Sequence, residues 1–189
     1  FPELEFDLVY TDANLDLLSE HIDLAIRLGP AESESAQRTK LLDTVYGVYA
    51  SPSYVDRTVE PLETPSDLAR HDVLRFRFSP FDSEWRARTF DASEETVIPI
   101  HGSIRSSNAL ALREAAVLGL GPALLADWLV SSELSNSKLV RLFPTYQFTA
   151  TSWDTAAWAV LPDRSHVPHK TRAVLGALKT LLSAKPRTE

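Results

Sequence analysis

Residues 4–30, LEFDLVYTDANLDLLSEHIDLAIRLGP, decide the fold class that this sequence predicts. Residues 4–10 alternate and are rich in β-forming side chains, which predicts a strand. Asp12 can then cap a helix, because apolar residues recur at helical spacing from Leu15 onward. Residues 23–28 form a short apolar run before a Gly-Pro pair, which predicts a second buried strand. Strand, helix and strand in so short a stretch predict a βαβ unit with a right-handed crossover.

The rest of the chain continues this interleaving of strands and helices. A clear helix is predicted over residues 106–118, and Pro168 begins a final helix with one apolar stripe. Residues 123–134 begin as a strand and continue as a helix. The other predicted strands cover residues 43–50, 72–78, 84–90, 94–101, 138–143 and 155–162. Interleaved elements predict an α/β fold, and two similar ends around a strand-rich middle predict two lobes, between which the chain crosses twice.

Composition and charge narrow the classes of function. The chain has 189 residues, of which 44% are apolar and 24% charged, and these values are typical of a globular protein. No apolar run approaches the roughly 18 residues that span a bilayer, and no basic-then-apolar leader opens the chain, so a cytoplasmic location is expected. The net charge of −7, from 19 basic and 26 acidic residues, predicts that this chain alone binds DNA poorly.

Motifs that would indicate a metal, cofactor or catalytic site are weak. The absence of cysteine excludes disulfides, thiolate metal sites and a cysteine nucleophile. Gly119 and Gly121 resemble half a dinucleotide fingerprint, but they end a predicted helix instead of opening one. His166 and His169 could suggest zinc, yet further ligands at suitable spacing are missing, so surface histidines are the preferred interpretation. Without a G-x-S-x-G elbow or paired carboxylates in an apolar setting, the sequence predicts no enzyme, no cofactor and no metal.

Five segments, in this order, resemble the effector domain of LysR-type bacterial transcriptional regulators. They are FPELEFDLVYTDANLDLLSEHIDLAIRLGP (1–30), ASPSYVDR (50–57), TPSDLARHDVLRF (64–76), GSIRSSNALALREAAVLGLGPALLADWLV (102–130) and LPDRSHVPHKTRAVLGAL (161–178). No single motif is decisive, but the ordered set covers nearly the whole chain. Ala126 departs from the pattern, since the family usually has a proline there.

The resemblance implies a two-lobed, periplasmic-binding-protein-like (type II) α/β fold that is truncated at its N-terminus. Lobe I would comprise residues 1–43 and 157–189, and lobe II would comprise residues 44–156. The family's winged helix-turn-helix domain would be missing, together with the first strand and first helix of the effector domain. Members of the family form dimers through these lobes and tetramers as full-length proteins. A homo-oligomer is therefore expected, with DNA bound only through the missing N-terminal domain.

The ligand-binding residues predicted in lobe I lie at the ends of strands. Thr11 follows the first predicted strand, at the edge where open α/β sheets bind ligands. Asp12 beside it is interpreted as a helix cap. Arg27 ends the second strand, and its planar guanidinium could hold a carboxylate. The alternatives for Arg27 are a solvated side chain or an ion pair with Asp12 or Asp23.

The remaining predicted ligand-binding residues lie in lobe II. Ser106, Ser107 and Asn108 open a helix whose N-terminal donors can bind an anion, and ordinary capping is a compatible interpretation. Arg75, Phe76 and Arg77 lie on an alternating strand, so the two arginines share one face and Phe76 lies on the other, and one face is expected to line a cleft that Arg75 or Phe76 contacts. A solvated polar face is the alternative for the arginine.

These residues together predict a function in sensing. We expect a small, anionic metabolite to bind between the lobes and to modulate DNA binding by the missing helix-turn-helix domain. The alternatives are a stand-alone solute-binding protein of the same fold and an enzyme whose catalytic residue the sequence does not reveal. A sheet that lacks one strand would also leave backbone groups unpaired, so self-association is expected.

Overall fold

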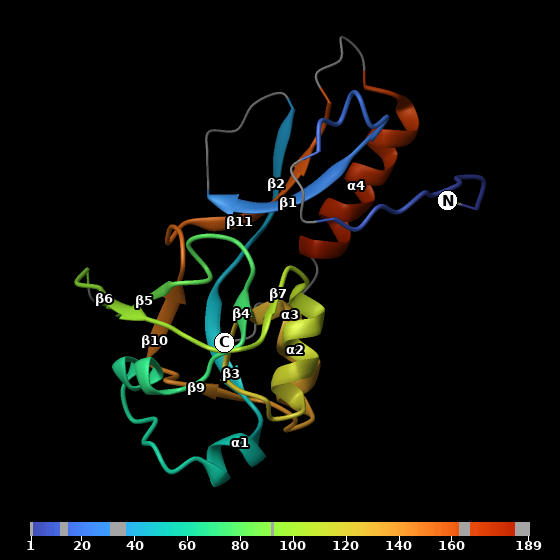
Figure 1. Cartoon of the computed structure of the whole chain (residues 1–189). Helices are drawn as coiled ribbons and strands as arrows, with labels where there is room; N and C mark the ends of the chain where they lie inside the picture. The colour runs from blue at the N-terminus through green and yellow to red at the C-terminus, as the bar shows by residue number, and fades with distance from the viewer. Residues whose placement is uncertain (1, 12–14, 31–36, 92, 163–166, 184–189) are drawn as a thin grey trace. The chain divides into compact units, whose positions relative to one another are not determined.

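The computed structural model describes residues 2–11, 15–30, 37–91, 93–162 and 167–183 (Figure 1). It contains two compact units, which we call unit 1 (Phe1–Asp43 and Asp154–Glu189) and unit 2 (Thr44–Trp153). The described elements, in chain order, are β1 (Ala25–Pro30), β2 (Arg38–Asp43), β3 (Tyr46–Ala50), α1 (Pro52–Arg57), the 3-10 helix η1 (Pro65–Arg70), β4 (Arg75–Phe76), β5 (Glu84–Thr89), β6 (Thr96–Pro99), β7 (Arg105–Ser106), α2 (Ala109–Val117), β8 (Ala123–Ala126), α3 (Asp127–Ser135), β9 (Val140–Leu142), β10 (Tyr146–Thr149), β11 (Thr155–Val160) and α4 (His169–Ser183). The predicted α/β class is confirmed.

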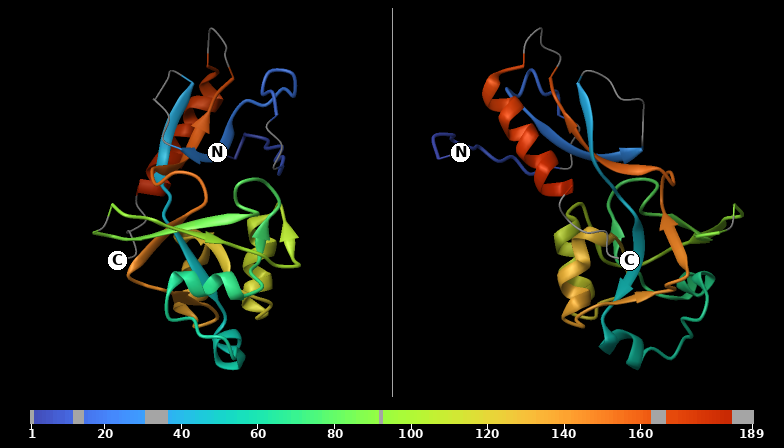
Figure 2. Two further views of the ribbon diagram at one scale, coloured as in Figure 1. Left: turned by 60° about the vertical axis from the view of Figure 1, so that its left-hand side comes forward. Right: turned by 180° about the vertical axis from the view of Figure 1, so that it is seen from behind.

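Unit 1 is a three-stranded antiparallel sheet with a helix packed on it. The strand order is β1–β11–β2, so the late strand β11 lies between the two earliest ones. Because it has a neighbour on each side, β11 is buried along nearly its whole length, as its apolar sequence predicts. Leu175, Leu178 and Leu182 of α4 pack against Ala157 and Ala159 of β11. Figure 2 shows α4 running along this sheet from two further directions.

The first segment of unit 1 differs from the prediction. Residues 4–10 form no strand, and Phe6, Leu8, Val9 and Tyr10 are exposed. Strand β1 pairs antiparallel with β11, so the predicted βαβ unit is absent from the described residues. An extended segment becomes a strand only when a neighbour takes up its backbone N–H and C=O groups. Residues 4–10 have no such neighbour among the residues that the structure describes.

The helix predicted to begin at Asp12 differs as well. Residues 12–14 lie outside the described residues. Beyond them the chain makes a single helical turn, with hydrogen bonds from Glu20 N to Asp16 O (3.1 Å) and from Ile22 N to Leu17 O (2.9 Å). A short helix needs tertiary packing for stability, and Leu17 is the one buried side chain over residues 15–22.

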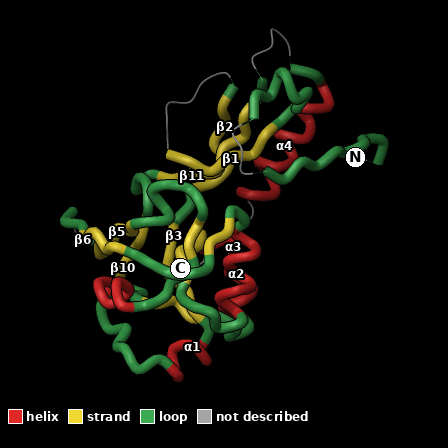
Figure 3. The backbone as a smooth tube through the Cα atoms, viewed as in Figure 1, coloured by secondary structure: helices red, strands yellow, loops and turns green. Residues whose placement is uncertain are grey.

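Unit 2 is built on an antiparallel sheet of order β6–β5–β10–β3–β8, in which β9 also pairs with β3. Helices α2 and α3 contact each other and strand β8, and Figure 3 draws them side by side in red. A separate parallel pair of very short strands, β4 and β7, completes the unit. Six strands of unit 2 overlap predicted strands, whereas β10 was not predicted and β7 lies at the start of the helix predicted over residues 106–118. In unit 1, β2 was missed as well, because the polar residues 31–40 predicted a loop and the next predicted strand began only at Asp43.

Strand β3 connects the two apolar cores of unit 2. Successive side chains of a strand point to opposite faces, so β3 can serve both. Tyr46, Val48 and Ala50 belong to the larger core, which also contains the buried Trp85. Tyr49 belongs to the second core, beneath α2 and α3. All five residues of β3 are buried, as an apolar run that ends at a turn predicts.

Gly47 leaves space for the ring of Tyr49. A Cβ atom on Gly47 would lie 2.7 Å from the Tyr49 hydroxyl oxygen and 2.9 Å from its Cζ atom. That hydroxyl donates a short hydrogen bond to Oδ1 of Asp127, in the first turn of α3. Burial, and then the nearby carboxylate, raise the pKa of the Tyr49 phenol, which therefore remains a donor. The glycine thus permits the contact that joins β3 to α3.

Gly47→Ala is expected to lower the free energy of unfolding by about 1–3 kcal/mol, because the new methyl group pushes the Tyr49 ring away from Asp127. Gly29→Ala is the matched control, a strand glycine whose added Cβ meets no atom within 4 Å. It should change the free energy by less than about 0.5 kcal/mol. Urea denaturation followed by tryptophan fluorescence measures both variants. Equal stabilities of the two variants would contradict this role of Gly47.

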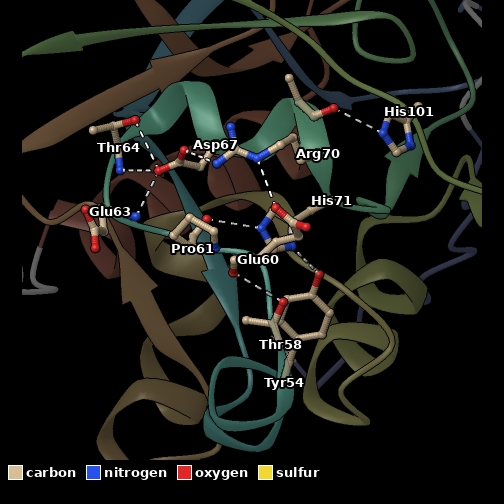
Figure 4. A network of polar contacts seen from close by, with 11 residues as sticks. Tyr54, Thr58, Glu60, Pro61, Glu63, Thr64, Asp67, Arg70, His71 and His101 are labelled. Atoms are coloured by element: carbon tan, nitrogen blue, oxygen red, sulfur yellow. Dashed lines mark hydrogen bonds and ion pairs between the residues drawn. The ribbon is translucent and has the colours of Figure 1, made fainter.

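A polar network holds the connector between α1 and η1 (Figure 4). Oδ2 of Asp67 accepts hydrogen bonds from the backbone N–H groups of Glu63 (2.9 Å) and Thr64 (2.7 Å). Its Oδ1 accepts one from Arg70 (2.6 Å), which also contacts Glu60 at 3.2 Å. The Thr64 N–H is the main cause that lowers the pKa of the buried Asp67, and the opposing effect of burial is smaller than the hydrogen bonds together.

Asp67→Asn should lower the free energy of unfolding at pH 7 by about 1–3 kcal/mol, because charge-assisted hydrogen bonds to a buried carboxylate are lost. Folding lowers the pKa of Asp67, so its contribution is complete above the unfolded value of about 3.9. The contribution disappears as the pH falls through the lower, folded value. The stabilities of wild type and variant should therefore begin to converge as the pH falls below about 4.

The matched control for this experiment is Glu60→Gln, which removes a largely exposed carboxylate of the same network. Surface ion pairs contribute little, so its effect should stay below about 1 kcal/mol at pH 7. Denaturation curves recorded across the acid range supply the comparison. A difference between wild type and Asp67→Asn that is the same at pH 7 and pH 3 would refute the proposed linkage.

Candidate ligand-binding site

The paired strands β4 and β7 bring together five of the predicted ligand-binding residues. In this parallel pair Phe76 is the neighbour of Ser106, and Arg75 lies one residue before it on β4. Ser107 and Asn108 follow directly on β7. A hydrogen bond from Arg75 N to Ile104 O (3.1 Å) fixes the start of the ladder. Residues 30 positions apart in the chain thereby become neighbours in unit 2.

Asn108 caps helix α2. Ordinary capping was the alternative interpretation that the sequence offered for these residues. Its Oδ1 accepts hydrogen bonds from the N–H groups of Leu110 (2.8 Å) and Ala111 (3.2 Å). Ser106 Oγ accepts one from Asn108 N (3.1 Å). The N-terminal donors that an anion would use are therefore largely taken up by the cap. Ligand contact by Ser106, Ser107 and Asn108 remains a prediction. It now depends mainly on the hydroxyl groups of the two serines.

Arg75 binds backbone carbonyl groups. Its two terminal nitrogens donate to Asp82 O and Gly102 O, each at 2.6 Å. Gly102 has φ +156°, and a Cβ there would lie 2.0 Å from Val73 O, so only glycine brings the chain this close. The guanidinium thus holds the loops around β4 and β7 together and is itself fixed in position by both terminal nitrogens.

Phe76 points to the other side of β4 and packs against both cores of unit 2. Its ring meets Phe78 at 5.3 Å and Phe81 at 5.5 Å between centroids, and the latter two are 5.3 Å apart. Aromatic clusters of this kind contribute beyond simple burial. Phe76 therefore anchors β4 to the core, whereas its role as a ligand contact stays a prediction.

Two further arginines on this face were not among the predicted site residues. Arg77 and Arg105 are exposed, and within the described chain neither guanidinium has a hydrogen bond or ion pair. Arg77 continues the ladder through a hydrogen bond from its backbone N to Ser106 O (3.1 Å). Alternation along β4 already placed Arg77 beside Arg75, but nothing local in the sequence reveals that Arg105 lies across from Arg75.

The other two predicted residues belong to unit 1. Thr11 is exposed. Arg27 lies on β1, and its terminal nitrogen donates to Leu15 O at 2.7 Å. Of its predicted alternative partners, Asp12 lies outside the described residues, and Asp23 forms an ion pair with Lys170 at 3.0 Å. Ligand binding by Thr11 and Arg27 remains a prediction.

An open groove of about 510 Å³ on unit 2 is a weaker candidate, because its polar groups satisfy one another (Figure 4). The ring of the buried His71 lies 2.9 Å from the Tyr54 hydroxyl and 3.3 Å from Pro61 O. His101 lies 3.0 Å from Asp72 and also contacts a backbone carbonyl.

No group of side chains suited to a metal ion occurs among the described residues, and the histidine at 166 lies outside them. None of the described helices is long and apolar enough to cross a bilayer.

Arg75→Ala is expected to lower the free energy of unfolding by about 1–3 kcal/mol, since two carbonyl groups lose a charged donor. Arg77→Ala is the matched control: it removes an exposed guanidinium on the same strand pair and should cost less than about 0.5 kcal/mol. Chemical denaturation of both variants provides the test. If Arg75→Ala is as stable as Arg77→Ala, the two carbonyl contacts do not hold these loops.

Solved structures identify the fold. The regulatory domain of CrgA, a LysR-type transcriptional regulator from Neisseria meningitidis, superposes with a TM-score of 0.78 at 26% identity, over 96% of this chain and 86% of that one. The full-length Vibrio cholerae virulence activator AphB gives a TM-score of 0.75 at 21% identity, over 96% of this chain and 59% of that one. The fold is the two-lobed, type II periplasmic-binding-like fold of these regulatory domains.

Sequence comparison gives the family. Residues 1–183 match the family described as the LysR substrate binding domain, and the chain belongs to this family. The chain is 27% identical over 187 residues to the HTH-type transcriptional regulator PtxR of Pseudomonas aeruginosa, covering 98% of this chain and 57% of that protein. It is 28% identical over 173 residues to an HTH-type transcriptional regulator of Haemophilus influenzae, covering 92% and 58%. The chain therefore spans little more than half the length of these relatives.

Proposed function

We propose that this chain is the effector-sensing domain of a LysR-type transcriptional regulator and that it binds a small, anionic metabolite. The match of residues 1–183 to the substrate-binding domain family carries the proposal. The names of its relatives, HTH-type transcriptional regulators that extend well beyond the matched region, support a role in regulation over a role in catalysis. The gene product acts in the cytoplasm, where its DNA lies.

The ligand acts by shifting a conformational or assembly equilibrium. It can do so only by its difference in affinity for the two states, whatever its absolute affinity. A helix-turn-helix domain elsewhere in the gene product responds to this shift with a changed affinity for operator DNA. This chain is unsuited to bind DNA itself, because its net charge is −7 and its basic residues are scattered.

Self-association is part of the proposal, as a dimer and, in the full-length protein, a tetramer. Ile26 and Leu28 of β1 are 53% and 48% exposed, on an edge strand whose outer side has no partner in the described chain. Apolar surface beside unpaired backbone groups favours contact with a second chain. Sedimentation velocity over a wide range of concentration measures this, and a stable monomer throughout would count against it.

The codons that precede Phe1 in the gene provide the direct test of the regulatory role. A helix-turn-helix pattern followed by a long linker helix is expected there. A secretory leader that runs straight into Phe1 would instead indicate a solute-binding protein, which shares the fold. That outcome would refute the proposal.

Arg27→Ala is expected to weaken ligand binding roughly 10- to 150-fold, the effect of losing one charge-assisted contact. Organic acids that raise the unfolding temperature of wild-type protein are first found by thermal shift, and calorimetry then gives their affinities. Arg172→Ala, which removes an exposed arginine of α4, is the control and should bind as wild type does.

Arg27 also donates to Leu15 O, so the stability of Arg27→Ala is measured beside its affinity. Unchanged affinity in a folded variant removes Arg27 from the binding site. Loss of folding would show that Arg27 is structural. Thr11→Ala then tests ligand contact at the other predicted residue of unit 1, which is exposed, with its stability measured in the same way.

A further inference from the structure

The exposed face of β4 and β7 carries two positive charges that the described chain does not neutralise. Arg77 and Arg105 have neither a carboxylate nor a carbonyl partner there. Most other arginines of unit 2 are engaged. Arg70, Arg86, Arg113 and Arg141 each lie within 4 Å of a carboxylate, Arg57 and Arg75 donate to carbonyl groups, and Arg88 stacks on Trp153. In an acidic protein with net charge −7, an uncompensated pair of arginines is a distinctive feature.

The strand pair places the two side chains together. Arg105 is the neighbour of Arg75 across the parallel ladder, and neighbouring strands lie about 4.8 Å apart. Arg75 and Arg77 share one face because side chains alternate along a strand, so Arg105 lies on that face too. Arg75 does not compete for a ligand there, since two carbonyl groups hold its guanidinium. The guanidinium groups of Arg77 and Arg105 therefore belong to one solvent-exposed face, with Arg77 two residues beyond the ladder neighbour of Arg105.

The positions of both arginines are set before a ligand arrives. The carbonyl contacts of Arg75 tie the loops on either side of the strand pair. Phe76 anchors β4 to the two cores, one residue before Arg77. Binding therefore orders the two side chains alone and not the backbone that carries them, which limits the loss of freedom. The start of α2 adds little, because Asn108 already accepts from its amide groups.

We propose that Arg77 and Arg105 together bind the two carboxylates of a small organic dicarboxylic acid. Each planar guanidinium fits one carboxylate through two parallel hydrogen bonds, so two neighbouring forks match two carboxylates on one carbon skeleton. A single phosphate would have to be reached by both side chains at one centre, whereas a dicarboxylate offers each guanidinium a carboxylate of its own. The assignment of this acid as the regulatory effector rests on the proposed function, whereas its binding to the two arginines does not.

Isothermal titration calorimetry of the chain with malonate, succinate and glutarate tests the proposal, with butyrate and inorganic phosphate as comparisons. At least one dicarboxylate should bind saturably and roughly 10-fold or more tightly than butyrate. Its affinity should fall as salt is added, since exposed charges are screened. Phosphate should bind more weakly than the best dicarboxylate.

Variants then locate the binding. Arg77→Gln and Arg105→Gln should each weaken binding of the best dicarboxylate roughly 10- to 150-fold and should abolish most of its advantage over butyrate. Arg172→Gln removes an equally exposed arginine from α4 and should leave the affinity unchanged. Both site variants should unfold at the same urea concentration as wild type, because neither side chain has an internal partner in the described chain.

The proposal is overturned if no dicarboxylate binds saturably, if phosphate binds most tightly, or if folded Arg77→Gln and Arg105→Gln bind as wild type does. If Arg27→Ala loses dicarboxylate binding and these two variants do not, this inference is refuted and the proposed function is retained. Another outcome would refute the proposed function and retain this inference. Dicarboxylate binding that depends on both arginines, in a gene product without a helix-turn-helix domain, would retain this inference and refute the regulatory function.

Discussion

Strand β3 is buried on both faces, and the arrangement of unit 2 depends on this burial. Tyr46, Val48 and Ala50 enter the larger core, and Tyr49 enters the second. A shift by one residue would therefore place each side chain in the other core, where neither the volume nor the Tyr49–Asp127 contact fits. Tyr49 adds a directional contact to Asp127 at the start of α3. Strand β3 pairs with β8 on one side, over residues 46–49, and with β9 and β10 on the other, so three strands take their register from it.

The candidate site depends on the same strand through a short series of backbone contacts. Leu74 N donates to Pro122 O at 2.7 Å, and Leu74 forms a bridge with Ala123, the first residue of β8. Strand β4 follows Leu74 directly and pairs with β7. The exposed arginines therefore stand on a rigid base that is connected to β3 by two steps. Rigid elements hold a binding group with little loss of freedom, whereas a loop would pay that loss on binding.

Sequence reasoning predicted what local patterns determine. The buried runs that became β3 and β11 and the apolar stripe of α4 were recognisable, because burial dictates which side chains a strand or helix can carry. The ordered resemblance to LysR-type regulators also predicted the family correctly. The alternation over residues 4–10 was misleading, since a pattern can favour a strand but cannot supply the neighbour that pairs with it.

The candidate site was less predictable because it depends on contacts between distant segments. Asp82 O and Gly102 O, which occupy Arg75, are 7 and 27 residues away from it in the chain. The pairing of β7 with β4 places Arg105 beside β4, and no local motif in the sequence predicts that position. Ser106 and Asn108 could be predicted as a helix start, but whether a cap consumes its donors is decided by the geometry of one side chain.

The most direct measurement of the central claim is the operator affinity of the complete gene product, with and without the acid that residues 1–189 bind. Fluorescence anisotropy with a duplex from the promoter of the gene itself, at physiological salt, gives both values. If the chain senses an effector for a DNA-binding domain, a saturating acid should change the affinity by about 5- to 150-fold. An operator affinity that is identical with and without the bound acid would contradict the account.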